Sequence, residues 1–197
     1  MKSLKRIMIA VMLGAVCCLV GCNVETEKET ETTTLTLQED GSIAHTIVES
    51  FDLSYYDADE LSAMANQKIE DYEGTVVCES VETEDDQVIV KMTYGSGEDY
   101  TGFNNREFFS GTVEEADAKG YRFEDMADKD GKSLSGDIPS AFSQNHVLAV
   151  QTGVGEELSV SVYGNILCVS SNVTISGKKE AYIGAAEDMT MSYIIFE

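Results

Sequence analysis

The chain has no tryptophan, one proline, two histidines and few basic residues. Its 13 Lys and Arg face 36 Asp and Glu, which gives a formal net charge of −23 at pH 7. Nucleic acids and anionic lipid surfaces are negative as well, so electrostatic repulsion argues against both as partners. An acidic surface can attract cations, but more commonly it keeps a protein soluble.

Sequence signatures of catalysis are also missing. Neither His45 nor His146 belongs to a Gly-x-Ser-x-Gly or a His-Glu-x-x-His pattern, and no glycine-rich phosphate loop follows a strand. His45 falls on the apolar side of a strand pattern, which is typical of a packed residue or of one at the edge of the core. Carboxylate pairs are too frequent in so acidic a chain to identify a general acid and base. The sequence therefore predicts no catalytic residue and no cofactor.

Three of the five cysteines, Cys17, Cys18 and Cys22, lie within six residues near the N-terminus. A short basic segment opens the chain, and residues 7–20 carry no charge. This apolar run is shorter than the roughly 20 residues that a membrane-spanning helix needs. A basic start, a short apolar core and small residues at its end are typical of a secretory signal.

The segment Leu19-Val20-Gly21-Cys22 fits the pattern Leu-x-Gly/Ala-Cys at every defined position, and so it resembles the lipobox of bacterial lipoproteins. The resemblance implies cleavage before Cys22 and a diacylglycerol thioether on its sulfur. Two acyl chains, each gaining about 0.8 kcal/mol per buried CH2, hold a protein stably on a membrane. We therefore expect residues 1–21 to be a signal peptide that removes the other two clustered cysteines. We expect the mature protein to be anchored to the cell membrane through Cys22, on the extracytoplasmic side.

Residues 22–33 form the link between this anchor and the rest of the chain. They are rich in Glu and Thr and predict a flexible, self-repelling tether. Without residues 1–21, ten basic residues remain against all 36 acidic ones, so the formal charge becomes −26. Cys78 and Cys168 both lie among strand-forming apolar residues, which favours free, buried thiols over one disulfide.

Residues 34–197 predict a globular α+β head. Its first half predicts the order strand-strand-helix-strand-strand. An Asp40-Gly41 turn separates the first two strands, and Asp57 precedes a helical pattern. The central segment has no strict period apart from a short helix near residues 113–119.

The last third predicts a β-meander or a small sandwich from six short strand patterns, with Gly164-Asn165 as a turn. These two halves make one domain or two subdomains, at about 34–96 and 97–197. The order of elements, with "LTLQEDGSI" and "DYTGFNNREFFSGTVEEADAKGY", resembles lipoproteins of Gram-positive bacteria. No activity comes with this resemblance.

A weak calcium pattern lies in the segment "MADKDGKSLSGD". With Gly131 at the sixth position of an EF-hand loop, Asp128, Asp130 and Asp137 take the third, fifth and twelfth positions. Met126 then stands where the first carboxylate is required. A simple Asp-Gly turn is the favoured alternative, and we expect no metal site.

Aromatic residues gather in the central segment, where they can fill the core or form an exposed ligand surface. They are Tyr94, Tyr100, Phe103, Phe108, Phe109, Tyr121 and Phe123. The core interpretation is favoured because the chain has no tryptophan.

The leading functional hypothesis is a non-catalytic binding or assembly module of the cell envelope, tethered to the membrane through the lipid on Cys22. Its partner would be an envelope protein or ligand that the sequence does not identify. One alternative is a hydrolase of envelope polymers that uses paired carboxylates, which a cleft with two facing carboxylates and a raised pKa would favour. Another alternative is a calcium-dependent binding module.

Overall fold

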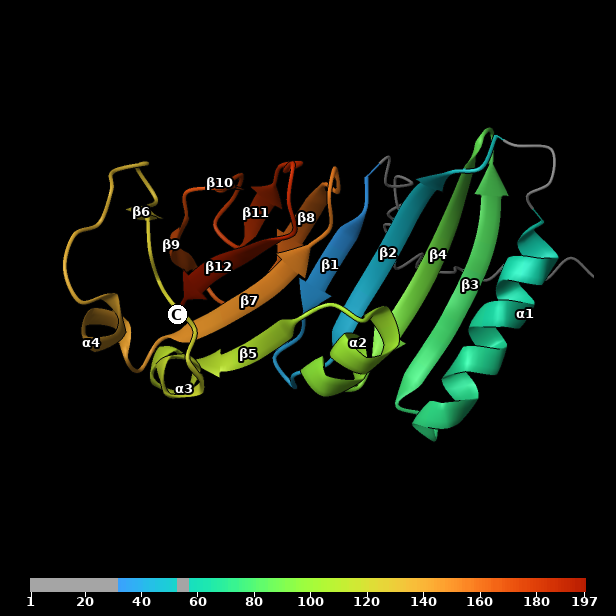
Figure 1. Cartoon of the computed structure of the whole chain (residues 1–197), viewed down its shortest axis with the longest axis horizontal. Coiled ribbons are helices and arrows are strands. Elements are labelled where there is room, and N and C mark those ends of the chain that lie inside the picture. The colour runs from blue at the N-terminus through green and yellow to red at the C-terminus, as the bar shows by residue number, and fades with distance from the viewer. Residues whose placement is uncertain (1–31, 53–56) are drawn as a thin grey trace, which may run out of the picture.

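Two β-sheets form the centre of the head (Figure 1). The computed structural model describes residues 32–52 and 57–197. Sheet A contains β1 (Thr34–Leu37), β2 (Ile43–Ser50), β3 (Val76–Glu84), β4 (Gln87–Tyr94), β8 (Leu158–Ser161), β10 (Val173–Ile175) and β11 (Glu180–Ile183). Sheet B contains β5 (Phe108–Thr112), β6 (Met126–Asp128), β7 (His146–Thr152), β9 (Ile166–Ser170) and β12 (Thr190–Phe196).

The strand order is β10-β11-β8-β1-β2-β4-β3 in sheet A and β5-β7-β12-β9-β6 in sheet B. Within the described strands, β1 and β8 pair in parallel and the other neighbours are antiparallel. Sheet A therefore joins strands from both halves of the chain. The α+β prediction is confirmed, and the two sheets pack as in a sandwich.

In the described part of the head there are four helices: α1 (Ala58–Ile69), α2 (Gly97–Asn104), α3 (Val113–Lys119) and α4 (Ile138–Phe142). A short 3₁₀ turn, η1 (Glu70–Tyr72), continues α1. Figure 1 shows α1 beside β3 at one end of sheet A, and α2 in front of the same sheet near β5. The sequence predicts α1 and α3, and both are confirmed. It did not resolve α2, β5, β6 or α4.

The core has two parts, one on each face of sheet B. Between the sheets, Leu35 and Ile43 of sheet A belong to the same buried cluster as Leu148 and Phe196 of sheet B. On the opposite face of sheet B, α3 and α4 cover a smaller cluster that includes Val147. Sheet B is therefore buried on both faces, which explains why β7 reads as a continuous apolar run rather than an alternation.

Local signals explain the first half of the chain. Gly41 adopts a φ of 87° in the β1–β2 turn, and the Asp40 carboxylate accepts hydrogen bonds from the backbone and side chain of Ser42. The Asp57 carboxylate caps α1 by accepting from the backbone N–H groups of Asp59 and Glu60.

The head begins one residue before β1. The Thr33 hydroxyl is hydrogen bonded to both the carbonyl and the amide of Val48, and the Thr33 carbonyl accepts from the Ser159 amide. Thr33, which the sequence places in the tether, is thus held by two strands of sheet A.

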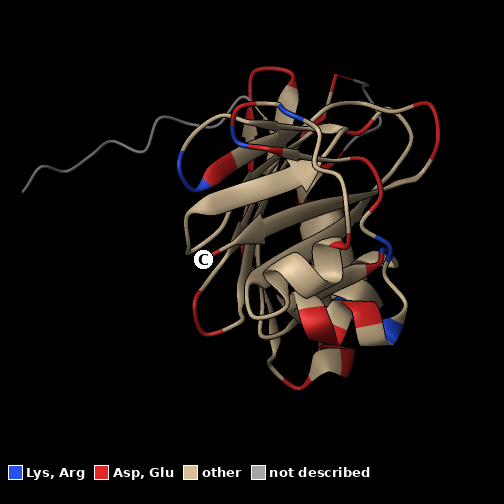
Figure 2. Ribbon diagram, turned by 90° about the vertical axis from the view of Figure 1, so that its left-hand side faces the viewer, with Lys and Arg blue, Asp and Glu red and all other residues tan. Residues whose placement is uncertain are grey.

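In the last third, the chain passes repeatedly from one sheet to the other. Gly164-Asn165 lies between β8 of sheet A and β9 of sheet B, so this turn connects the sheets instead of closing a hairpin. A side chain at Gly164 would collide with the C-terminal Glu197 backbone, which explains the glycine. Acidic residues lie mainly in the connecting loops and helices, while the strands carry few (Figure 2).

Candidate functional site

The predicted lipidation site, Cys22, lies outside the described residues. Cys78 and Cys168 are both free thiols, and they lie in different sheets. Cys168 is fully buried, and burial raises the pKa of its thiol to about 12. Cys78 is only partly buried. Its pKa is raised mainly by this burial and, to a smaller extent, by the negative charge of the nearby Glu79 carboxylate. Neither thiol therefore ionises readily enough to act as a nucleophile at neutral pH.

His45 is a packed core residue, the first of the two positions that its strand pattern allows. Its side chain is 6% exposed, and its ring centroid lies 5.6 Å from that of Tyr100 and 6.4 Å from that of Tyr94. Neither ring nitrogen has a hydrogen-bond partner, and burial lowers the pKa of His45 to about 4. His146 instead packs against Tyr163 and Phe196.

The calcium pattern folds as a turn. The Asp128 carboxylate accepts from the backbone N–H groups of Asp130 and Lys132, and Gly131 adopts a φ of 75°. The Asp137 carboxylate caps α4 by accepting from the backbone and hydroxyl of Ser140. Each carboxylate thus serves its own loop or helix end. Within residues 32–52 and 57–197, no three His, Cys, Asp or Glu side chains form a group able to hold a metal ion.

The described carboxyl groups whose pKa is displaced all move downward. They are Asp40, Glu115, Asp128 and Asp137. Hydrogen bonds from nearby backbone amides or hydroxyls are the main cause in each case. A general acid for glycoside hydrolysis needs a raised pKa, and none is found among these residues.

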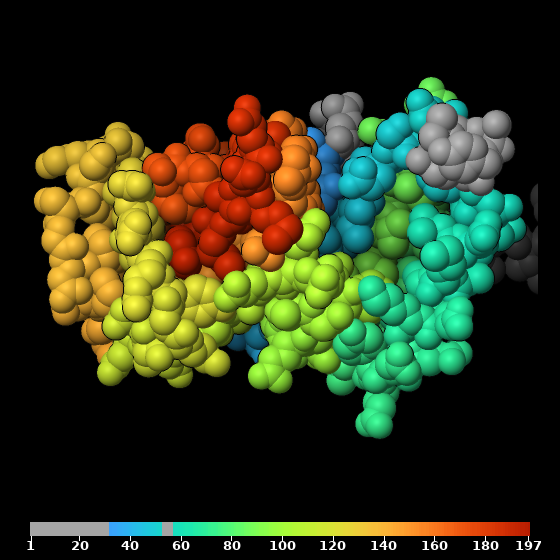
Figure 3. Space-filling model, viewed as in Figure 1, coloured from blue at the N-terminus to red at the C-terminus, as the bar shows by residue number. Residues whose placement is uncertain are grey.

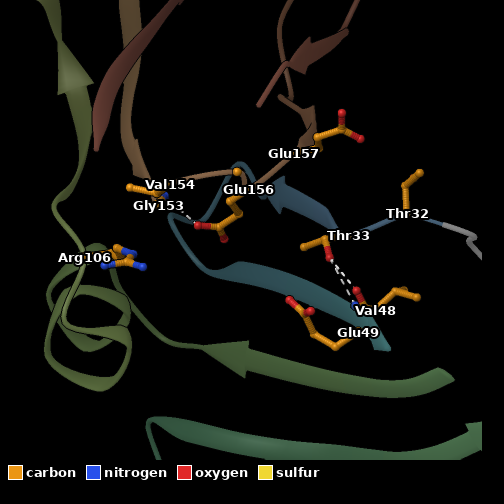
Figure 4. A pocket seen from close by; sticks show the side chains of 10 residues that line it. Thr32, Thr33, Val48, Glu49, Arg106, Gly153, Val154, Glu156 and Glu157 are labelled. Carbon is orange, nitrogen blue, oxygen red and sulfur yellow. Dashed lines mark hydrogen bonds between the residues drawn. The ribbon is translucent and has the colours of Figure 1, made fainter. Parts of the chain in front are cut away.

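A polar pocket of about 530 Å³ lies where the chain crosses from sheet B to sheet A (Figure 4). One wall is the crossover loop of residues 153–157, between β7 and β8. The other walls are Arg106 and the paired ends of β1 and β2, at Thr32, Thr33, Val48 and Glu49. Its volume is in the range of small-molecule sites in proteins.

The end of α2 places Arg106 in this pocket. Asn105 ends the helix in the left-handed conformation, at φ 52°, and asparagine tolerates that conformation better than most residues. The next residue is Arg106, and the backbone of Glu107 is then hydrogen bonded to Gln151 of β7. The Arg106 Nη1 lies 3.7 Å from the Met189 sulfur, a weak acceptor.

Gly153 lies between the positive and negative groups of the pocket. Its backbone N–H donates to the Glu156 carboxylate at 2.6 Å. A Cβ atom at this position would lie 2.6 Å from Nη2 of Arg106 and 2.9 Å from Oε2 of Glu156. Glycine at this position leaves room for both the guanidinium and the carboxylate beside the loop (Figure 4).

The pocket combines charge with an exposed apolar rim. Glu49, Glu156 and Glu157 line it together with Arg106, and the Glu157 carboxylate is hydrogen bonded to the Tyr182 hydroxyl. Val154 in the lining and Met189 beside Arg106 are 68% and 56% exposed. The two charged groups also affect the pKa of the buried Tyr100 hydroxyl. Burial is the main cause that raises this pKa; the Glu156 carboxylate adds to the rise, and the Arg106 guanidinium opposes it. Such a site can hold a polar ligand through several directional contacts.

Sequence reasoning did not single out this pocket. Arg106 and Arg122 are the only arginines after residue 21, and this rarity was the one available signal. Only the tertiary structure brings residues 32–33, 48–49, 106 and 153–157 together.

Comparisons of the chain with protein-family models, curated proteins and solved structures found no match. Among the described helices, none is long and apolar enough to cross a membrane.

Proposed function

We propose that the protein is a lipid-anchored, extracytoplasmic binding module of the cell envelope that performs no catalysis. The observation that carries the binding role is the Arg106 pocket, which has a ligand-sized volume and groups of both charges around Gly153. The anchoring role is supported by the lipobox pattern that ends at Cys22.

The pocket lies next to the tether in this proposal, since Thr32 and Thr33 are among its lining residues. Ten residues separate Cys22 from Thr32, and a fully extended chain of that length spans at most about 35 Å. A lipid on Cys22 would therefore keep the pocket close to the membrane surface.

The charges in the pocket favour a ligand that carries both an anionic and a cationic group. A guanidinium recognises carboxylate oxygens, and the carboxylates of Glu49 and Glu156 offer acceptors for an ammonium group. A purely anionic ligand would be repelled by these glutamates. Free amino acids and short peptides have the required combination of charges.

The test is ligand binding to the full chain in detergent, using a panel of amino acids and dipeptides as probes. Thermal unfolding should show stabilisation by at least one probe, because a ligand that binds only the native state raises its stability. Arg106→Gln should abolish this stabilisation, whereas Arg122→Gln should keep it, since Arg122 is exposed and pairs with Asp117. Stabilisation that persists in Arg106→Gln, or that no probe produces, would refute the assignment of this pocket.

A further inference from the structure

A second pocket, of about 470 Å³, lies at the opposite end of the β1–β2 hairpin from Thr32. The β1–β2 turn, the start of α2, the strand β5 and the end of α3 contribute to it. Figure 3 shows a notch between α3 and α2, with the blue turn at its floor. It is lined by Asp40, Gly41, Gly95, Ser96, Gly97, Glu98, Phe108, Phe109, Ser110, Lys119 and Tyr121. Three of the aromatic residues of the central segment thus meet here.

Two of these aromatic rings form a fixed wall. The rings of Phe109 and Tyr121 lie 5.2 Å apart at an interplanar angle of 34°. Burial, together with a hydrogen bond to the Glu107 carboxylate, raises the pKa of Tyr121 to about 12, so its hydroxyl stays a neutral donor. The Phe109 ring covers Gly111, where a Cβ atom would lie 2.7 Å from Cζ. Rings held in this way lose little freedom when a ligand packs on them.

The third ring is fixed by the start of α2. Phe108 is 7% exposed, and a Cβ atom at Gly97 would lie 2.7 Å from its Cδ1. Gly97 therefore lets the first turn of α2 pack directly against the ring. The remaining glycines leave backbone rather than side chains at the floor of the pocket.

Polar groups stand around this aromatic wall. Asp40 and Glu98 supply carboxylates, Ser110 supplies a hydroxyl and Lys119 supplies an ammonium group. The Lys119 Nζ lies 5.6 Å from the centroid of the Phe109 ring. The pocket thus offers one apolar face and several hydrogen-bonding groups at its edge.

This combination discriminates between classes of ligand. The two carboxylates repel an anionic ligand. Lys119 is already within cation–π distance of Phe109, so it competes with a quaternary ammonium group for that ring and repels it. A lipid chain would offer no hydrogen bond to the Glu98 carboxylate, the Ser110 hydroxyl or the Lys119 ammonium group. A compact, neutral molecule with one apolar face and several hydroxyl groups satisfies every part of the lining.

We propose that this pocket binds a neutral saccharide. One face of a pyranose ring presents C–H bonds that pack on an aromatic ring, while the hydroxyls at its edge donate to carboxylates. The volume of about 470 Å³ lies in the range of small-molecule sites in proteins. The site is separate from the Arg106 pocket, and its failure or success leaves the proposed binding role of Arg106 unaffected.

Ligand-detected saturation-transfer NMR on the full chain, in a detergent without a sugar headgroup, tests this proposal. The probes are a β-1,4-linked N-acetylglucosamine trimer and tetramethylammonium chloride. We expect saturation transfer to the trimer and none to the ammonium ion. Phe109→Leu should weaken trimer binding by about tenfold, because an aromatic contact is lost while the apolar volume is retained.

Phe123→Leu is the matched control, because Phe123 is a partly buried aromatic residue of the same core cluster that does not line the pocket. It should leave the dissociation constant within about twofold of the wild-type value. Glu98→Gln, a change at an exposed residue, tests the edge of the pocket without touching the core and should also weaken binding. The proposal is overturned if the trimer does not bind, if tetramethylammonium binds instead, or if Phe109→Leu and Phe123→Leu weaken binding equally.

Discussion

His45 should make the head sensitive to mild acid. In the folded state, burial holds its pKa at about 4, compared with 6.5 for a free histidine. Between these two values the unfolded chain binds a proton that the folded chain does not, so the free energy of unfolding falls as the pH falls. The stability that the neutral, buried His45 allows is fully present above pH 6.5 and is lost progressively as the pH falls toward 4.

The size of the effect follows from the difference between the two pKa values. A shift of about 2.5 units corresponds to about 3.4 kcal/mol, and about 2 kcal/mol of this should be lost between pH 7.5 and pH 5. Small domains have only about 5–15 kcal/mol of stability in total, so such a loss is easily measured. The neighbouring Tyr94 and Tyr100 stay neutral throughout, because burial raises the pKa of both hydroxyls.

Urea unfolding followed by circular dichroism at pH 7.5 and pH 5 measures this loss, with His45→Leu as the test variant. The variant should lose about 2 kcal/mol less than the wild type over this interval. It should also be more stable at pH 7.5, because two buried nitrogens without partners are removed. His146→Leu keeps His45 and should retain the wild-type loss. Equal losses in the wild type and His45→Leu would refute the buried, neutral state of His45.

Replacing Cys22 by serine should prevent lipidation; equal incorporation of a clickable fatty acid by the wild type and the variant would contradict the lipobox assignment. Calcium and magnesium at equal ionic strength should raise the melting temperature alike. Asp130→Ala should change this little, since backbone amides bind the Asp128 carboxylate, Lys129 pairs with Asp130, and Asp137 caps α4. A calcium-specific rise that the variant abolishes would restore the metal hypothesis. At pH 8, a maleimide reagent should label Cys78 of the native protein much faster than the fully buried Cys168. In denaturant, it should label both thiols at the same rate. Equal rates in the native state would show that Cys168 is accessible.

The sequence alone determined the elements whose signals are local. The Asp40-Gly41 turn, the Asp57 cap and the alternation of buried and exposed residues in β1 and β2 act over a few residues, and the structure has each of them. His45 follows the same alternation, which placed it on the apolar side of β2, and the structure decided between a packed and an edge position.

Tertiary structure decided how the strands are distributed between the two sheets. The parallel pair of β1 and β8 joins segments more than a hundred residues apart, and no local pattern encodes such a contact. The same holds for α2 and β5, whose aromatic residues have no regular period because they pack against different elements. Sheet B is covered on both faces, so apolar and polar residues do not alternate along its strands. The sequence therefore could not show which face of these strands packs against sheet A.

Both pockets were likewise decided by the tertiary structure. Arg106 follows a helix that the sequence did not resolve, and Gly153 matters only because a guanidinium and a carboxylate approach it from other parts of the fold. Phe109 and Tyr121 were visible as aromatic residues, but their role as a pocket wall depends on the β1–β2 turn lying opposite them. Chemistry at these sites arises from groups distant in the chain, and the packing of the two sheets brings those groups within reach of one ligand.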